Sequence, residues 1–432
     1  MDIKNLLLYR KMEHQRLFER MAGLLGFSDC LSSPDQREGE DGAACCSQLV
    51  DLAVTYGFEG NLWHCFLALC LANNENPYTT TCEIRGAAGG SLDSLALEDY
   101  RIFKALFDAD VSHLEPERLW AVIADYKPSG RESRVFNRRI RERIVRLAVQ
   151  LAQAADPEAF QQCMVDFYHE FGVGKFGLNK AFRILKREGE AVVIDPIINV
   201  EHIYLKDIVG YELQKQKLVE NTEAFIEGRE ANNVLLFGDA GTGKSSSVKA
   251  ILNEYYSRGL RIIEVYKHQF QCLSQVLEQI KDRNYKFIIY MDDLSFEDYE
   301  LEYKYLKAIL EGGLGRRPDN VLIYATSNRR HLIREKFSDK RELDDELHNN
   351  DTVQEKLSLA ARFGVTIYYG SPDKRQFETI VRELAARYGL SMPEEELFAQ
   401  ANKWELSHGG LSGRTAAQFI THLRGKRPVE DL

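Results

Sequence analysis

The sequence predicts an α/β fold in which a mostly α-helical N-terminal domain precedes a parallel-sheet core and a small helical lid. Apolar residues recur three and four positions apart through the first 190 residues, which is the period of helices packed on a core. From about Val192, short β-branched and aromatic runs alternate with helical segments, as in a parallel sheet covered on both faces. The helical period returns after Ser371. We therefore expect domains over residues 1–190, 191–370 and 371–432.

The composition is that of an ordinary globular protein. The chain has 432 residues, enough for several domains of roughly 100–200 residues each. Hydrophobic residues make up 44%, which excludes wholesale disorder because several cores can be buried. Lys and Arg number 56 against 66 Asp and Glu, giving a net charge of −10. This balance excludes a surface coated in positive charge, although a local basic patch could still bind nucleic acid.

Targeting signals and metal-binding patterns are missing from the sequence. The N-terminus lacks the uninterrupted apolar block of a secretory signal, and no run approaches the ~18 apolar residues of a membrane helix. Eight cysteines occur without a C-x-x-C pair, which favours free thiols in a reducing compartment over a metal site. We expect a cytoplasmic protein that does not contact a membrane.

The N-terminal domain is expected to contain helices around Leu6–Leu25, Ala96–Phe107 and Phe136–Leu151. Seven arginines between Arg131 and Arg146 overlap the third of these helices. Such a run could contact nucleic-acid phosphates, but its apolar stripe favours an amphipathic helix whose solvent-exposed face is basic. We therefore do not favour nucleic acid as a partner, and we expect this domain to bind an unknown protein.

The core is predicted to contain five strands, and the helical lid follows the last of them. An acidic and amide-rich segment, Ile333 to Lys356, is predicted to be a loop before the fifth strand. In the lid, an apolar stripe runs from Phe377 to Tyr388. The expected strands are Asn233–Phe237, Arg261–Val265, Lys286–Met291, Val321–Thr326 and Gly364–Tyr369.

A phosphate-binding loop connects the first of these strands to a helix. The segment from Gly238 to Ser245 reads GDAGTGKS, which is G-x-x-x-x-G-K-S in the strand–loop–helix setting that this motif requires. Its glycines let backbone N–H groups turn toward a phosphate, and the helix N-terminus adds a positive dipole end. Lys244 should reach the β- and γ-phosphates and Ser245 should hold Mg²⁺. The expected nucleotide-binding residues here are Gly238, Asp239, Ala240, Gly241, Thr242, Gly243, Lys244, Ser245 and Ser246.

Two further strands end in polar side chains that hydrolysis would require. Asp292 and Asp293 follow the apolar strand ending at Met291, so Asp292 is the candidate Mg²⁺ partner and Asp293 the candidate base for water. Asn328 follows the next strand and could orient the water or the γ-phosphate, since ligands of open α/β sheets sit at strand C-termini. A turn-forming role is the alternative for Asn328.

The order of motifs resembles that of the AAA+ ATPases. GDAGTGKS is followed by YMDDLSF, YATSNRRHL, EKLSLAARFG and GLSGRTAAQF. The residues of these motifs are most similar to those of the bacterial ATP-binding proteins catalogued as domain of unknown function 815. The resemblance covers Tyr204 to Ile420 and implies a P-loop NTPase core of the AAA+ type that binds ATP and Mg²⁺.

The resemblance also implies roles for individual residues. Ile208 and Val209 correspond to the segment that packs on adenine, and Asn328 corresponds to the first sensor. Arg362 corresponds to the arginine finger that reaches the neighbouring subunit's nucleotide, which implies a homo-oligomer. Arg414 corresponds to the second sensor on the lid. Each guanidinium would stabilise charge on the γ-phosphate, and a plain surface charge is the alternative for each arginine.

The motif set predicts an enzyme that hydrolyses Mg·ATP to remodel or load a partner. Many AAA+ proteins carry Asp-Glu at the end of the third core strand, whereas this chain has Asp292-Asp293, whose second carboxylate is one methylene shorter. A nucleotide-dependent binding switch with little turnover is therefore a second hypothesis. A nucleic-acid-associated ATPase is the third.

Overall fold

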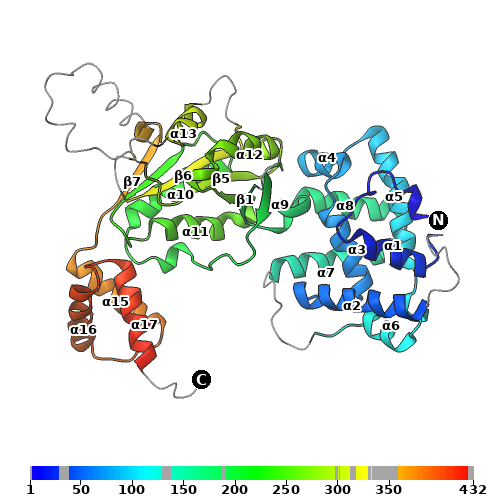
Figure 1. Ribbon diagram of the computed structural model, residues 1–432, viewed down its shortest axis with the longest axis horizontal. Helices are drawn as coiled ribbons and strands as arrows, with labels where there is room; N and C mark the ends of the chain where they lie inside the picture. The colour runs from blue at the N-terminus through cyan, green and yellow to red at the C-terminus, as the bar shows by residue number, and fades with distance from the viewer. Residues whose placement is uncertain are drawn as a thin grey trace. The chain divides into compact units, whose positions relative to one another are not determined.

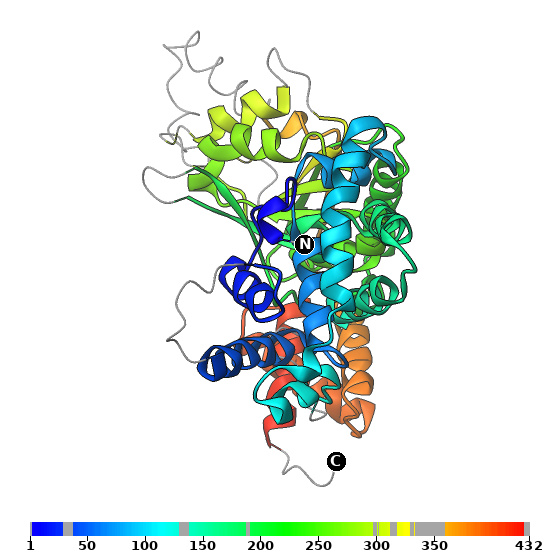
Figure 2. The ribbon, with the colours of Figure 1, turned by 90° about the vertical axis from the view of Figure 1, so that its right-hand side faces the viewer.

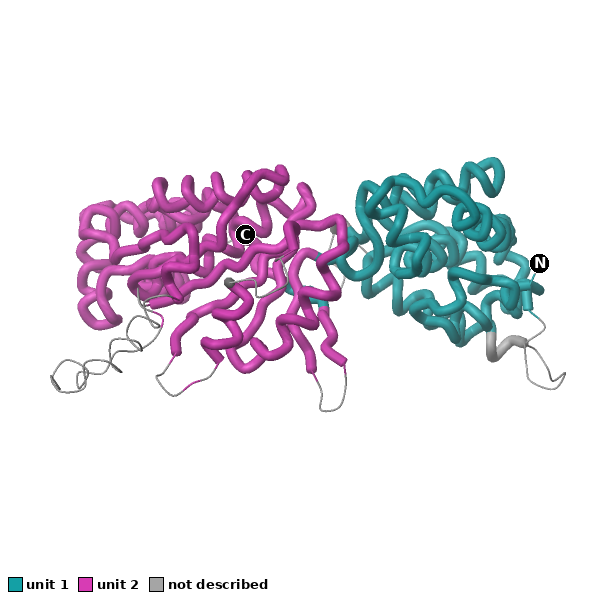
Figure 3. The backbone as a smooth tube through the Cα atoms, turned by 90° about the horizontal axis from the view of Figure 1, so that it is seen from above, with its two compact units in different colours: residues 1–179, 196–199 teal, residues 180–195, 200–432 magenta. Residues whose placement is uncertain are grey.

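The computed structural model divides the chain into two compact units, coloured separately in Figure 3. Unit 1 contains Met1–Asn179 with Pro196–Asn199, and unit 2 contains Lys180–Asp195 with Val200–Leu432. The predicted boundary at residue 190 lies inside unit 2, because the chain has already entered the sheet by then. The structure describes residues 2–28, 38–128, 138–186, 191–296, 300, 302–311, 318–328, 332 and 359–426.

Unit 1 is helical, as its apolar period predicts. The helix α3 is apolar around its whole circumference, and its residues from Cys65 to Ala72 are all buried, so its neighbours surround it. Figure 1 shows this helix among the others of the unit. The helices are α1 (Gln15–Leu24), α2 (Glu38–Tyr56), α3 (Leu62–Asn73), α4 (Pro77–Arg85), α5 (Gly90–Asp108), α6 (Glu117–Ala124), α7 (Arg138–Gln153), α8 (Pro157–Phe171) and α9 (Gly174–Leu178).

A buried carboxylate holds the N-terminal segment on unit 1. Asp99 of α5 is fully buried, and it accepts hydrogen bonds from the backbone N–H groups of Leu7, Leu8 and Tyr9 at 2.8–3.1 Å. Burial raises the pKa of Asp99, while the three donors act in the opposite direction. The Tyr9 hydroxyl continues the network to Tyr100 at 2.6 Å.

The arginine-rich segment forms the amphipathic helix α7. Ile140 and Ile144 are buried in the core, whereas Arg141 pairs with Glu59 at 3.1 Å. Arg143 donates to the carbonyl of Gly177, and its guanidinium and that of Arg146 lie over the ring of Phe171. These arginines therefore take part in contacts within unit 1. Arg131, Arg134 and the side chains of Arg138 and Arg139 lie outside the described residues.

Unit 2 is built on a seven-stranded sheet of order β2-β1-β4-β5-β6-β3-β7. All five predicted strands are present within one or two residues of their predicted ends, and each pairs in parallel with its neighbours. β1 and β2 extend the sheet at one edge and were not predicted. The strands are β1 (Ala181–Leu185), β2 (Val193–Pro196), β3 (Val234–Gly238), β4 (Leu260–Glu264), β5 (Lys286–Met291), β6 (Val321–Ser327) and β7 (Val365–Tyr369).

Helices cover both faces of this sheet. The helix α11 (Lys244–Tyr255) packs on β4 and β6, and α10 (Glu212–Ile226) packs on β7 and α11. Figure 1 shows α12 (Leu273–Ile280) and α13 (Glu302–Glu311) on the side of the sheet away from α11. The predicted loop from Ile333 to Lys356 lies outside the described residues.

The lid is a bundle of three helices at the end of unit 2: α15 (Lys374–Arg387), α16 (Glu394–Ser407) and α17 (Gly413–Lys426). It appears as one orange-to-red cluster in Figures 1 and 2. The lid has its own apolar core, in which Phe377, Val381 and Ala416 are buried. None of the helices in the described ranges combines the length and the apolar character needed to cross a bilayer.

We expect Asp99→Ala to lower the free energy of unfolding of unit 1 by about 3 kcal/mol, because three backbone donors lose their acceptor. Urea unfolding followed by tryptophan fluorescence measures this, since Trp63 and Trp120 are both buried in unit 1. The neighbouring Glu98→Ala is the control, because the Glu98 side chain is exposed and its ion pair with Arg101, at 3.7 Å, lies on the surface, where it contributes little. Equal losses in the two variants would contradict the role of Asp99.

Candidate nucleotide-binding site

The phosphate loop lies between the end of β3 at Gly238 and the start of α11 at Lys244. Gly238, Gly241 and Gly243 adopt positive φ angles of 131°, 75° and 93°, which favour glycine. A Cβ at Gly238 would lie 2.1 Å from the carbonyl oxygen of Tyr369 on β7. The sharp turn therefore depends on glycine for both its backbone angles and its close approach to the next strand.

Lys244 extends back along the loop rather than into solvent. Its ammonium donates to the carbonyls of Gly238 at 2.8 Å and Asp239 at 2.6 Å, and to Oδ1 of Asn328 at 3.1 Å. The residue is 6% exposed, and burial lowers the pKa of its amine while nearby carboxylates oppose that shift. These three acceptors account for the three donors of an ammonium, so a phosphate must replace some of them.

Asp292 lies at the centre of a cluster of hydroxyl groups. Its Oδ1 accepts hydrogen bonds from Ser245 at 2.7 Å, Tyr290 at 2.7 Å and Thr326 at 2.6 Å. Burial works to raise the pKa of Asp292, but these hydroxyls outweigh it, and the pKa lies below its usual value. Burial and the nearby Asp292 raise the pKa of the Tyr290 phenol, which keeps it a donor at neutral pH. Asp292 is therefore an ionised carboxylate beside the predicted metal-binding serine.

Asp293 is joined to Lys244 through Asn328. The amide of Asn328 donates to Oδ1 of Asp293 at 2.7 Å, while its own Oδ1 accepts from Lys244. The backbone N–H of Asp293 donates to Thr326 Oγ1 at 2.9 Å, and its φ of 50° is unusual for a residue other than glycine. The side chains predicted at the ends of β5 and β6 thus lie together at the phosphate loop.

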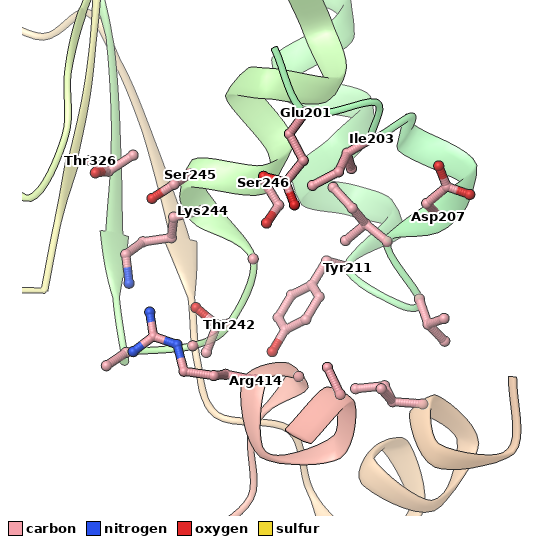
Figure 4. A pocket seen from close by; sticks show the side chains of 18 of the residues that line it. Glu201, Ile203, Asp207, Tyr211, Thr242, Lys244, Ser245, Ser246, Thr326 and Arg414 are labelled. Carbon is pink, nitrogen blue, oxygen red and sulfur yellow. The ribbon is translucent and has the colours of Figure 1, made fainter. Parts of the chain in front are cut away.

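A cavity of about 690 Å³ extends from these groups to the lid, which is within the size range of small-molecule sites. Figure 4 shows Lys244, Ser245 and Thr326 on one side of it and Tyr211 farther along. The Arg414 side chain extends from α17 toward Lys244. The apolar residues of its walls are Ile203, Ile208, Val209, Ile380, Leu384 and Ala417.

The lid is hydrogen-bonded directly to the phosphate loop. Asp239 Oδ2 accepts from the backbone N–H of Ser371 at 2.7 Å and from its hydroxyl at 2.9 Å, where the chain leaves the sheet for the lid. The N–H of Arg414 donates to the carbonyl of Gly241 at 3.2 Å. Both the entry to the lid and its last helix are therefore fixed to this loop.

Most residues predicted for the site gather around one cavity. The cavity is lined by Ile208 and Val209, by residues 240–246, and by Asp292, Asp293, Asn328 and Arg414. Gly238 and Asp239 lie directly beside it through their bonds to Lys244. Arg362, just before β7, is not among the residues that line this cavity of its own chain.

Several contributors to the site carry no motif signal. Tyr211 stacks on Tyr369 with ring centroids 5.2 Å apart, and it lines the cavity. Arg387 also lines the cavity and donates to the carbonyl of Asp207 at 3.1 Å. Tyr290 and Thr326, by contrast, had a usable signal, because each stands near the end of a predicted strand, two residues before Asp292 and Asn328 respectively.

The donor set fits a magnesium nucleotide. A serine hydroxyl and an ionised carboxylate share a hydrogen bond at 2.7 Å, and both are hard oxygen ligands. The described residues contain no group of three or more His, Cys, Asp or Glu that could hold a metal alone. Mg²⁺ is usually held by one or two carboxylates together with substrate phosphates, and Asp292 could supply such a carboxylate.

Sequence comparison assigns the chain to a family. A family model described as "Protein of unknown function (DUF815)" matches residues 178–427, more than half of the chain. The chain belongs to the DUF815 family. This match confirms the resemblance to that family predicted from the motifs, and the parallel sheet and phosphate loop form the expected P-loop NTPase core, followed by the predicted helical lid.

Other similarities of this DUF815 chain are partial. A stretch of 73 residues is 34% identical to the replication factor C large subunit of Methanococcus vannielii, covering 17% of this chain and 15% of that protein. The RuvB Holliday junction branch migration motor of Thermotoga maritima is 15% identical over 51% of this chain and 64% of its own, with a TM-score of 0.36. PCH-2 of C. elegans is 17% identical over 53% and 66%, with the same TM-score of 0.36.

The loop geometry predicts that Gly238→Ala destabilises unit 2 by roughly 3 kcal/mol or more and abolishes ATP binding, because the new Cβ meets backbone. Gly259→Ala is the matched control, since Gly259 has a φ of 90° but no atom within 4 Å of an added Cβ. It should cost only about 1–2 kcal/mol of backbone strain. Thermal unfolding and titration with ATP measure both effects. If Gly238→Ala destabilised the protein no more than Gly259→Ala does, this account would be contradicted.

Proposed function

We propose that this protein binds Mg·ATP between its core and its lid and hydrolyses it to ADP and phosphate, in order to remodel or load a protein partner. One observation carries the proposal. A single hydrogen-bonded chain joins the phosphate-loop lysine, Asn328 and Asp293 at one end of a cavity with apolar walls toward the lid. Such a cavity can hold a triphosphate at its charged end and a base at its apolar end.

Lys244 would bind the β- and γ-phosphates. Its ammonium would exchange the carbonyls of Gly238 and Asp239 for phosphate oxygens, which accept stronger, charge-assisted hydrogen bonds. Ile208 and Val209 would contact the base from one wall, and Ile380 and Leu384 from the lid. The lid would therefore bind the same nucleotide as the loop to which it is bonded.

Ser245 and Asp292 would hold Mg²⁺. The bound ion would neutralise charge on the phosphate oxygens. Asp293 would accept the proton of the attacking water, with its carboxylate oriented by the amide of Asn328. Arg414 would stabilise charge on the γ-phosphate, since its side chain already extends toward Lys244.

Arg362 would act on the nucleotide of a neighbouring copy. It does not line the cavity of its own chain, so a role in the reaction requires a second subunit. Unit 1 would then bind the protein partner. The cysteines of the described residues are all free thiols, which supports our placement of the protein in a reducing compartment such as the cytoplasm.

A second candidate function is a nucleotide-dependent binding switch with little turnover. The short side chain of Asp293 and its hydrogen bond to Asn328 favour this alternative, because both restrict how the carboxylate can approach a water. Measuring phosphate release at saturating Mg·ATP separates the two functions. Tight ATP binding without steady release would support the switch.

Replacing the phosphate-loop lysine should remove the function. We expect Lys244→Ala to weaken ATP binding at least ~100-fold and to abolish phosphate release, because the main phosphate cation is lost. Lys281→Ala serves as the control, since Lys281 is a surface lysine paired with Glu278 on α12. Unchanged affinity and turnover in Lys244→Ala would refute the proposal.

The role of Arg362 in a neighbouring site can be tested by mixing two inactive variants. Lys244→Ala subunits keep the arginine, and Arg362→Ala subunits keep the phosphate loop. Random mixing in equal amounts should restore about a quarter of the wild-type rate if each site takes its arginine from one neighbour. Phosphate release is the measurement. A fully active monomer, or no recovery in assemblies shown to be mixed, would exclude this role.

A further inference from the structure

We propose that the hydroxyls of Tyr290 and Thr326 form a clamp that positions Asp292 for Mg²⁺ and couples it to Asp293. This inference rests on the proposed Mg·ATP function and assigns it two positioning residues. Both hydroxyls donate to the same atom, Asp292 Oδ1, at 2.7 and 2.6 Å. We call this pair the hydroxyl clamp.

The first step concerns the two oxygens of Asp292. Within the described residues, the hydrogen bonds to this carboxylate come from three hydroxyls and all reach Oδ1. Two or three donors fill the accepting capacity of one carboxylate oxygen. The clamp therefore restrains rotation of the carboxylate and leaves Oδ2 the less occupied oxygen.

The second step separates the clamp from the third donor. Tyr290 and Thr326 are 5% and 1% exposed, and they belong to the neighbouring strands β5 and β6. Ser245 instead opens the helix of the phosphate loop and is itself the predicted metal ligand. When Ser245 turns toward a metal, the clamp hydroxyls keep their acceptor, because they lie within the sheet. Asp292 would therefore remain oriented through the binding cycle.

The third step concerns Thr326 alone. Its Oγ1 donates to Asp292 and also accepts the backbone N–H of Asp293 at 2.9 Å. Asp293 has a left-handed φ of 50°, a conformation that such a bond helps to hold. Thr326 thus connects the carboxylate of Asp292 to the backbone of the candidate base, Asp293. The hydroxyl of Tyr290 bonds to Asp292 and not to the backbone of Asp293.

The test uses variants that remove a hydroxyl and preserve shape. Tyr290→Phe and Thr326→Val delete the clamp hydroxyls, while Thr326→Ser retains one. Tyr324→Phe is the matched control, because Tyr324 is a fully buried tyrosine of β6 whose hydroxyl bonds to Thr222 at 2.8 Å, away from Asp292. Thermal unfolding checks that each variant is folded.

The decisive readout is the affinity for a non-hydrolysable fluorescent ATP analogue, measured with saturating Mg²⁺ and again with EDTA. The ratio of the affinity with Mg²⁺ to the affinity with EDTA is the Mg²⁺ gain. We expect each clamp deletion to reduce this gain about tenfold, as commonly happens when a metal ligand loses a residue that hydrogen-bonds to it. Affinity in EDTA should stay within about twofold of wild type. Thr326→Ser should restore the gain and Tyr324→Phe should leave it unchanged.

Phosphate release then distinguishes the two clamp residues. Saturating Mg·ATP should restore turnover in Tyr290→Phe but not in Thr326→Val, because of the two clamp residues only Thr326 also holds Asp293. Clamp variants that keep the full Mg²⁺ gain, or that lose affinity equally in EDTA, would overturn the clamp. Absence of nucleotide binding by the wild-type protein would overturn the proposed function instead.

Discussion

The parallel pairing of β3 with β6 on one side and β7 on the other is the constraint on which the site depends. Its register places Phe237 opposite Ser327 and Gly238 opposite Tyr369. The phosphate loop therefore starts beside Asn328, which follows β6, and beside the point where the chain leaves β7 for the lid. Parallel strands bring their carboxyl ends to one edge, so residues about ninety positions apart meet there without a dedicated loop. A slip of one residue would reverse the faces of every side chain involved.

The electrostatics of the site follow from burial at this edge. Lys244 is an almost fully buried cation, and backbone carbonyls with the Asn328 amide oxygen replace its water. Asp292 is an anion whose side chain reaches solvent, and three hydroxyls stabilise it more than the nearby cation Lys249 does. Neither charge is paired directly with the other. Both are thus held ionised while remaining available for a ligand of opposite sign, which a direct salt bridge between them would have neutralised.

The sequence predicted those parts of the site that local motifs encode. The phosphate loop, the two aspartates and Asn328 were found because each follows a strand with its own apolar pattern. Tyr211 and Arg387 were missed, since their roles come from the long-range partners Tyr369 and Asp207. Tyr290 was missed although its partner Asp292 is only two residues away, because a tyrosine within an apolar strand is usually a core residue. The strand β1 was missed because it lies within the first 190 residues, where the helical period dominates the pattern. The strand β2 was missed because its four residues, which end at Pro196, are too few to show an alternation. The structure brings the motif residues together, but the roles predicted for them, and for Arg362 and Arg414, stay predictions.

The hydrogen bonds between the phosphate loop and the lid suggest how a change at a bound nucleotide could alter the position of the lid. Asp239 holds Ser371 through two hydrogen bonds, and Gly241 holds Arg414 through a third. At about 1 kcal/mol each, these bonds are strong enough to bias the position of the lid yet weak enough to break and form again. Because Asp239 and Gly241 flank Ala240 in the same turn, a change in that turn would act at once on the entry to the lid and on the start of its last helix. We therefore expect the lid to respond to the loop's conformation directly, without a relay through the sheet.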